Sequence, residues 1–181
     1  MKKSPASLKI SKTDAARRQL ESAIRLWFYD GDPVSVHTLA AAAHQLVHDL
    51  GKARGITAVL RELPDIRPEY KKQVHQAIAR DENFFKHADR DPDALLEFKP
   101  VATEFFIIDA VLTYEALTSE RPPVFRTYQM WMTLQNPDLV RDDLKAEWLA
   151  QSKVMQPYLA RMSKQEFFTT YLDVLSKHQT A

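Results

Sequence analysis

The fold is decided by the stretch Ser35-Val-His-Thr-Leu-Ala-Ala-Ala-Ala-His-Gln-Leu-Val-His-Asp-Leu50, which Gly51 follows. Its apolar residues recur three and four positions apart, the spacing of one face of an α-helix. A glycine directly after such a pattern is typical of a helix end. The run from Ala40 to Ala43 would let a neighbouring helix approach closely, because these side chains are small. The stretch therefore predicts a helix that packs tightly against a neighbour.

Helical spacing continues along the rest of the chain, and no segment shows the two-residue period of a strand. Prolines separate most of the periodic segments. The other expected helices cover residues 13 to about 29, 56–62, 68 to about 88, 102–118, a segment from Tyr128 to Asn136, 138–155, and a last helix that Ser163 and Glu166 cap. A short turn is expected from Asp93 to Phe98. We therefore expect an all-α single-domain bundle of about seven or eight helices over residues 13–181, after a flexible basic arm at 1–12.

The composition excludes several classes of protein. The chain has 181 residues, with 25 Lys and Arg against 24 Asp and Glu, so its net charge is +1. That balance excludes the strong overall field of a typical non-specific nucleic-acid binder, but it leaves room for a local basic patch. Cysteine is absent, which excludes disulfides, thiolate nucleophiles and cysteine-based metal sites. The three glycines cannot form a phosphate-binding loop, and no cofactor motif is visible, so no cofactor is expected.

No segment predicts a membrane span. The most apolar run, Phe105–Ile108, meets Asp109 at once, far short of the roughly 20 apolar residues that a span needs. The basic arm lacks the apolar core of a signal peptide. We therefore expect a cytoplasmic protein without a membrane segment. Asp109 itself lies among apolar residues and is expected to be a buried partner of Arg80 or of a histidine.

The stretch from Arg80 to His87, Arg-Asp-Glu-Asn-Phe-Phe-Lys-His, carries the first candidate site. Helical spacing places Arg80, Asn83 and His87 on one side of the helix, and Arg90 extends the stripe if the helix continues that far. Asp81 falls near the middle of the apolar face. A lone buried carboxylate is costly, so Asp81 should meet an arginine, a histidine or a helix N-terminus.

Two interpretations of this stripe are open. In the chemical one, His87 transfers a proton at neutral pH, Arg80 holds a phosphate, and Asn83 orients a ligand oxygen or the imidazole. In the structural one, the same residues form a polar network that fixes this helix against a neighbour.

The spacing from Arg80 to His87, with Asp81 directly after the arginine, is similar to the R-x(4–6)-H motif of HEPN domains. That resemblance implies an all-helical protein, either a metal-independent ribonuclease or a non-catalytic relative, in a defence or toxin–antitoxin setting. It implies that His87 acts as general acid and base on the RNA 2′-hydroxyl, that Arg80 holds the phosphate and that Asp81 assists. It also implies two copies of the motif facing each other across a dimer. The chain further resembles a loose group of uncharacterised bacterial helical proteins, through its "HTLAAAA" and "NFFKHADRDP" segments.

A second candidate site lies on the alanine-rich helix, where His37, His44 and His48 share a stripe. The segment Val47-His-Asp-Leu-Gly-Lys52 resembles the core of HD-domain phosphohydrolases. That resemblance implies a metal held by His48 and Asp49, with a distant acid such as Asp109, and His44 could share the ion. However, the HD family takes its first histidine from an earlier helix, and none precedes His37. A polar seam between helices is the alternative.

The leading functional expectation is therefore a HEPN-like protein with a site at Arg80, Asp81, Asn83 and His87. Its expected partners are a second copy or another protein, and RNA. The alternative is a helical interaction or small-ligand-binding protein without catalysis, and an HD-type phosphohydrolase is third.

Overall fold

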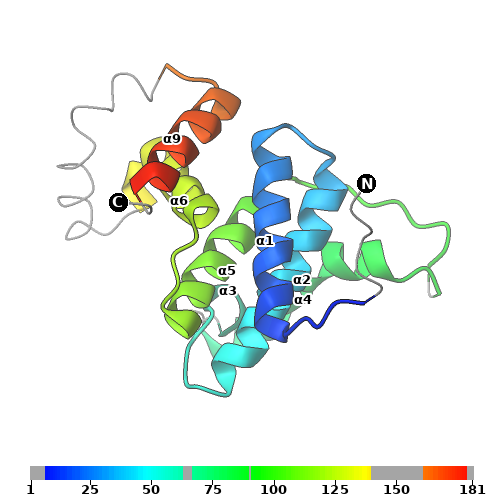
Figure 1. Ribbon diagram of the computed structural model, residues 1–181. Coiled ribbons are helices and arrows are strands. Elements are labelled where there is room, and N and C mark those ends of the chain that lie inside the picture. The colour runs from blue at the N-terminus through cyan, green and yellow to red at the C-terminus, as the bar shows by residue number, and fades with distance from the viewer. Residues whose placement is uncertain (1–6, 63–66, 90, 140–160, 179–181) are drawn as a thin grey trace.

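The structure is a computed structural model, and it describes residues 7–62, 67–89, 91–139 and 161–178. These residues form seven α-helices and one 3-10 turn, with no strand among them, so the all-α prediction is confirmed (Figure 1). In chain order the elements are α1 (Lys12–Phe28), α2 (Pro33–Lys52), α3 (Val59–Glu62), α4 (Pro68–Lys86), α5 (Ala102–Thr118), α6 (Pro123–Gln135), η1 (Pro137–Leu139) and α9 (Lys164–His178). None of the described helices is long and apolar enough to cross a membrane.

Helices α1, α2 and α5 form the centre of the bundle, with α2 between the other two. Ala40, Ala41 and Ala43 are fully buried, as their small side chains predicted. They let α2 contact both neighbours closely. The apolar positions of α1 that face this core include Leu20, Ile24 and Phe28, spaced four residues apart.

Helices α6 and α9 lie side by side and extend the same core. They contribute a group of aromatic side chains around Trp27 and Phe28 of α1. The group consists of Tyr128, Trp131, Phe167 and Phe168, whose rings meet those of α1 mostly edge to face. The described helices other than α3 and α4 therefore share one apolar core.

The caps and ends of the helices differ from the expectations at several points. Ser11, not Thr13, caps α1, in a capping box with Asp14. Gly51 does not end α2. It is buried inside the last turn, where an added Cβ would lie 3.2 Å from the carbonyl oxygen of Ile56. The glycine is therefore needed for a close approach between chain segments, and the helix runs on to Lys52.

Helix α4 ends at Lys86, earlier than expected, because the backbone of His87 is extended (φ −130°, ψ 125°). The expected short turn from Asp93 to Phe98 has other bounds in the structure. A turn forms at residues 92–93, where the backbone N–H of Ala94 donates to the carbonyl of Asp91 at 3.0 Å, and residues 94–98 form no turn or helix. The expected helix at 138–155 lies almost wholly outside the described residues. The capping box of Ser163 and Glu166 at the start of α9 is confirmed by their reciprocal hydrogen bonds.

Candidate functional site

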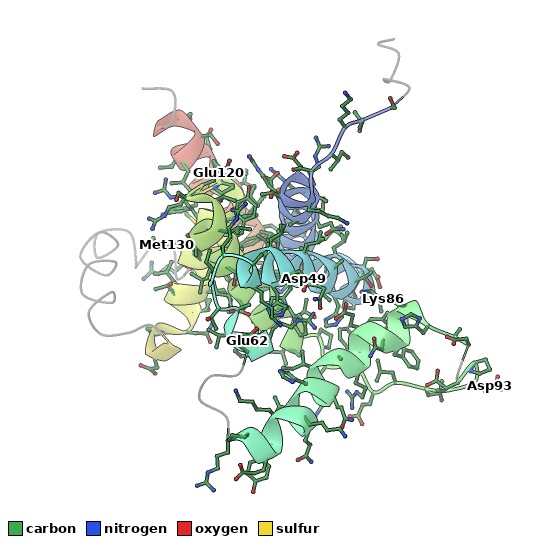
Figure 2. All side chains as sticks on the ribbon, turned by 90° about the horizontal axis from the view of Figure 1, so that it is seen from below. Asp49, Glu62, Lys86, Asp93, Glu120 and Met130 are labelled. Atoms are coloured by element: carbon green, nitrogen blue, oxygen red, sulfur yellow. The ribbon has the colours of Figure 1, made fainter. Side chains whose placement is uncertain are left out.

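Helix α4 sits at the edge of the bundle and presents one long side away from it (Figure 2). Its inner side contacts α2, and its acidic residues Asp81 and Glu82 are buried there. Its outer side is basic. We define the basic face of α4 as the exposed residues Lys72, His75, Arg80, Lys86 and His87. A shallow hollow on this side is lined by Lys72, His75, Gln76, Ala79 and Asn83.

Charges on α4 are thus sorted by side, although the whole chain is nearly neutral. Of the acidic residues of this helix, only Glu69 is exposed. Burial raises the pKa of Glu82, but the nearby charges of Lys86 and Arg61 outweigh burial, and the net shift is downward. Glu82 therefore stays ionised inside the structure, where it pairs with Lys86 at 2.5 Å and with Arg61 at 3.2 Å.

Arg80 and Asp81 form an ion pair, with Nε of the guanidinium 2.9 Å from Oδ1 of the carboxylate. The side chain of Arg80 is 60% exposed, whereas that of Asp81 is 10% exposed. The expectation that buried Asp81 would meet an arginine is confirmed. No described residue accepts a hydrogen bond from the terminal amino groups of Arg80, so these groups can still bind an anion.

His87 lies directly beyond the end of α4. Its backbone N–H donates to the carbonyl of Asn83 at 3.0 Å, which closes the helix. Its imidazole is exposed, and no described residue is hydrogen-bonded to it. Arg80, Asn83 and His87 all lie on the exposed surface, a question that the spacing left open, and no direct contact joins their side chains. Arg90 lies outside the described residues.

A second polar cluster joins α2, α3, α4 and α5 inside the protein. His44 Nε2 lies 2.7 Å from Asp109 Oδ2, and Arg61 Nε donates to His44 Nδ1 at 3.1 Å. The other end of Arg61 donates to Glu82 Oε2 at 3.2 Å. The expectation that Asp109 would be the buried partner of a histidine is confirmed. Asp109 also accepts the backbone N–H groups of Val59 and Leu60, and so fixes the start of α3.

The geometry fixes the protonation of His44. Arginine stays charged and can only donate, so His44 Nδ1 must accept and carries no proton. The single ring proton therefore lies on Nε2, where it is donated to Asp109. In this neutral state both ring nitrogens of His44 are engaged, and neither is open to a metal ion or a substrate.

His37 is a core residue. It is 1% exposed, its Nδ1 lies 2.9 Å from the hydroxyl of Thr103, and its ring contacts Phe85, Phe98 and Phe106. Burial lowers the pKa of His37, and the charges of Asp81 and Glu82 only partly oppose this shift. The ring is therefore neutral at pH 7 and takes part in packing.

His48 and Asp49, the paired metal ligands of the HD-like interpretation, do not come together, although His44 and Asp109 do. Asp49 is exposed and accepts a hydrogen bond from Gln45 at 2.8 Å, whereas His48 Nε2 lies 3.8 Å from Glu62. Burial lowers the pKa of His48. Within the described residues, no three His, Cys, Asp or Glu side chains are placed to hold a metal ion. The stripe of His37, His44 and His48 instead forms a polar seam between helices.

Sequence reasoning missed Arg61 and Glu82, the two residues that link His44 to α4. Arg61 lies in a helix of four residues, too short to show a periodic pattern. Glu82 looks like an ordinary surface acid because Lys86 follows it four positions later. The one available signal was the pair of adjacent acids, Asp81 and Glu82, on the apolar side of an otherwise basic helix. No family model, no curated protein and no solved structure matches the chain.

Proposed function

We propose that this protein is a HEPN-like ribonuclease that binds RNA along the basic face of α4 and cleaves it without a metal ion. The observation that carries the proposal is the sorting of charge on α4. Asp81 and Glu82 are buried, each paired with one cation of the helix, and Lys72, Arg80 and Lys86 lie on the exposed side, in a chain whose net charge is only +1. A nearly neutral protein with one basic helix face is suited to hold a polyanion in one orientation.

The length of the basic face suits a single strand of RNA. Lys72 and Lys86 are 14 positions apart, which corresponds to about 21 Å along the helix axis. A strand lying along this face could pair several phosphates with the cations of α4, while Gln76 and Asn83 offer amide groups to the sugar edges.

The proposed reaction is transfer of the phosphoryl group to the neighbouring 2′-oxygen. A neutral His87 takes the proton of the 2′-hydroxyl, and the 2′-oxygen forms a bond to phosphorus. The bond from phosphorus to the 5′-oxygen breaks, and that oxygen takes a proton from a protonated His87 of a second copy. The products are a 2′,3′-cyclic phosphate and a 5′-hydroxyl. Arg80 holds the non-bridging phosphate oxygens, where negative charge develops.

Two copies are part of the proposal because one copy supplies a single histidine beside Arg80. The other histidine of the basic face, His75, has its Nε2 2.6 Å from the carbonyl oxygen of Arg61. Arg80 and His87 are seven positions apart, about 10 Å along the axis, and no contact joins their side chains. The exposed ends of two α4 helices could bring two histidines and two arginines to one phosphate. Neither His87 is buried, so such an approach needs no unfolding.

The test is cleavage of single-stranded RNA in the presence of EDTA, with sedimentation velocity to establish the number of copies. We expect wild type to produce 2′,3′-cyclic phosphate ends and to leave an all-2′-deoxy strand intact. We expect His87→Ala to lose at least about a hundredfold in rate, the usual contribution of a general acid–base. It should still bind RNA, because the phosphate contacts remain.

Arg80→Ala should weaken both RNA binding and cleavage, and Arg18→Ala is the matched control. Arg18 is exposed on α1 and contributes the same charge away from α4. Its removal should leave both the affinity for RNA and the cleavage rate unchanged. The nuclease assignment is lost if wild type does not cleave RNA, or if His87→Ala cleaves as fast as wild type.

A non-catalytic interaction protein is the second candidate. Its supporting observation is an apolar stripe on the outer side of α5, where Val101, Phe105 and Leu112 are all exposed. Such patches mark binding surfaces for other chains. RNA binding without cleavage, together with self-association that Leu112→Glu abolishes, would favour this candidate over the nuclease.

A further inference from the structure

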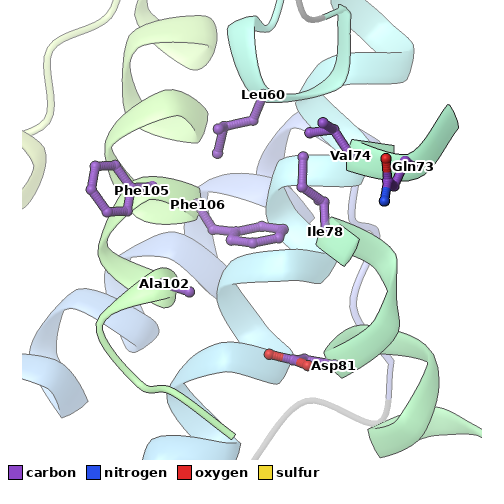
Figure 3. A pocket seen from close by; sticks show the side chains of 8 residues that line it. All are labelled: Leu60, Gln73, Val74, Ile78, Asp81, Ala102, Phe105 and Phe106. Carbon is purple, nitrogen blue, oxygen red and sulfur yellow. The ribbon is translucent and has the colours of Figure 1, made fainter. Parts of the chain in front are cut away.

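An apolar groove runs between α4 and α5 (Figure 3), and it shares no lining residue with the hollow on the basic face. Its volume is about 400 Å³. Its walls come from three helices, α3, α4 and α5. The apolar lining residues are Leu60, Val74, Ile78, Ala102, Phe105 and Phe106.

Each end of this groove carries one polar side chain of α4, Asp81 at one end and Gln73 at the other. The two residues are eight positions apart, which places them about 12 Å from each other along the helix axis. The groove is therefore an apolar trough of about that length with a carboxylate at one end and an amide at the other.

Asp81 is the unusual member of the lining. Its side chain is nine-tenths buried, and the Arg80 guanidinium is hydrogen-bonded to Oδ1 alone. No described residue donates to Oδ2, and Oδ2 is not one of the buried atoms that lack a hydrogen-bond partner, so it reaches solvent from the groove. An ammonium group that replaced the water there would form a charge-assisted hydrogen bond with the carboxylate.

We propose that this groove binds a small amphiphilic cation, an apolar body of about 12 Å with an ammonium head that donates to Asp81. Phe105, Phe106 and Ile78 would cover the apolar body. A neutral apolar molecule would leave Oδ2 without a donor, and an anionic one would meet the carboxylate charge. An amphiphilic cation is thus the class of ligand that matches both the apolar walls and the Asp81 carboxylate.

Arg80 does not block this site. Its side chain is 60% exposed and holds Asp81 through one nitrogen, so it can share the carboxylate or turn outward when a ligand arrives. The inference does not depend on RNA cleavage, because the groove and the hollow on the basic face share no lining residue. Arg80 separates the two proposals, since its removal should impair cleavage and improve binding of the cation.

The experiment uses three probes with the same chain, octylamine, octanol and octanoate, in isothermal titration calorimetry at pH 7. We expect the affinity for octylamine to exceed that for octanol about tenfold, the value of one charge-assisted hydrogen bond, and octanoate to bind most weakly. Asp81→Asn should remove the preference for the amine, and Arg80→Gln should tighten amine binding.

Two further variants keep the test decisive if Asp81→Asn folds poorly. Phe105→Ala shortens a half-exposed wall residue and should weaken the binding of octylamine and octanol alike. Leu112→Ala removes an exposed apolar side chain of the same helix that does not line the groove, and should change neither affinity. The inference is overturned if wild type binds no probe saturably, if octanol binds as tightly as octylamine, or if folded Asp81→Asn keeps the preference for the amine.

Discussion

At the scale of single residues, the structure contrasts two aspartates that the HD-like interpretation both named as metal ligands, Asp109 and Asp49. Asp109 is buried and accepts hydrogen bonds from His44 and from two backbone N–H groups of α3. Asp49 is exposed and accepts one hydrogen bond from Gln45. Asp109 therefore satisfies three hydrogen-bond donors, whereas water can take the place of the Asp49 carboxylate at Gln45.

This contrast gives a prediction for stability. Asp109→Ala leaves three donors without an acceptor and should lower the free energy of unfolding by about 3–5 kcal/mol. Asp49→Ala should change it by less than about 0.5 kcal/mol, the usual range for exposed sites. Urea unfolding followed by circular dichroism measures both. Equal effects of the two substitutions would mean that the network of His44 contributes no stability.

At the scale of the elements, α4 packs Ile78 and Phe85 against the bundle and is joined to the short helix α3 by polar contacts. Arg61 is central, because its side chain joins His44 to Glu82 and its carbonyl lies 2.6 Å from His75 Nε2. Lys71 adds a bond to the carbonyl of Glu62. Because these polar contacts join α4 to the edge of the bundle, their loss should let α4 open locally while the apolar core stays closed.

Arg61→Met tests this attachment. It keeps the length of the side chain but removes both charged hydrogen bonds, so it leaves Glu82 with Lys86 alone. We expect backbone amides of α4 to exchange with deuterium about tenfold faster or more, and those of α1 to keep their rates. Arg54→Met is the control, since Arg54 donates to the carbonyl of Leu117, far from α4 in the chain. Unchanged exchange in α4 of Arg61→Met would show that other contacts hold the helix.

Elements whose ends depend on local chemistry were predictable from sequence, and those set by distant contacts were not. The bounds of α5 follow from prolines on both sides, and the start of α9 follows from its capping box. By contrast, α4 was expected to reach about residue 88 but ends at Lys86, where His87 turns to extended backbone with no glycine or proline at that point. Gly51 was expected to end α2, but its role depends on contact with Ile56.

The candidate site divides in the same way. Helical spacing was enough to place Arg80, Asn83 and His87 on one side of the helix, but not to show that this side is exposed. The cost of burying a charge was enough to predict a partner for Asp81. The link from His44 through Arg61 to Glu82 spans three helices, so no local pattern could reveal it. Helical spacing in one sequence likewise cannot predict which contacts a second copy or an RNA strand would add to the site.

At the scale of the whole molecule, buried ionisable groups couple stability to pH, with opposite signs. Burial lowers the pKa of His37 and of His48 from the ordinary value of 6.5. Below that pH the unfolded chain binds protons that the folded chain does not, so these histidines make stability fall as pH falls. Burial raises the pKa of Glu104 and of Glu115 from 4.5. As pH falls, these carboxyls bind protons in the folded chain before they do so in the unfolded chain. They therefore make the free energy of unfolding rise as pH falls toward 4.5.

Because the two contributions oppose each other, the pH dependence of the wild type alone does not isolate either one. The difference between wild type and His37→Gln does. At pH 7.5 the variant should be less stable, since glutamine fits poorly among Phe85, Phe98 and Phe106. Below pH 6.5 wild type should lose stability relative to the variant, by at most about 1.4 kcal/mol per pH unit, because only wild type must keep a buried imidazole unprotonated.

Thr113→Val, a buried substitution on α5 that removes no titratable group, should differ from wild type by the same amount at every pH. A difference between wild type and His37→Gln that stays constant from pH 7.5 to 5 would show that His37 is protonated equally in the folded and the unfolded chain.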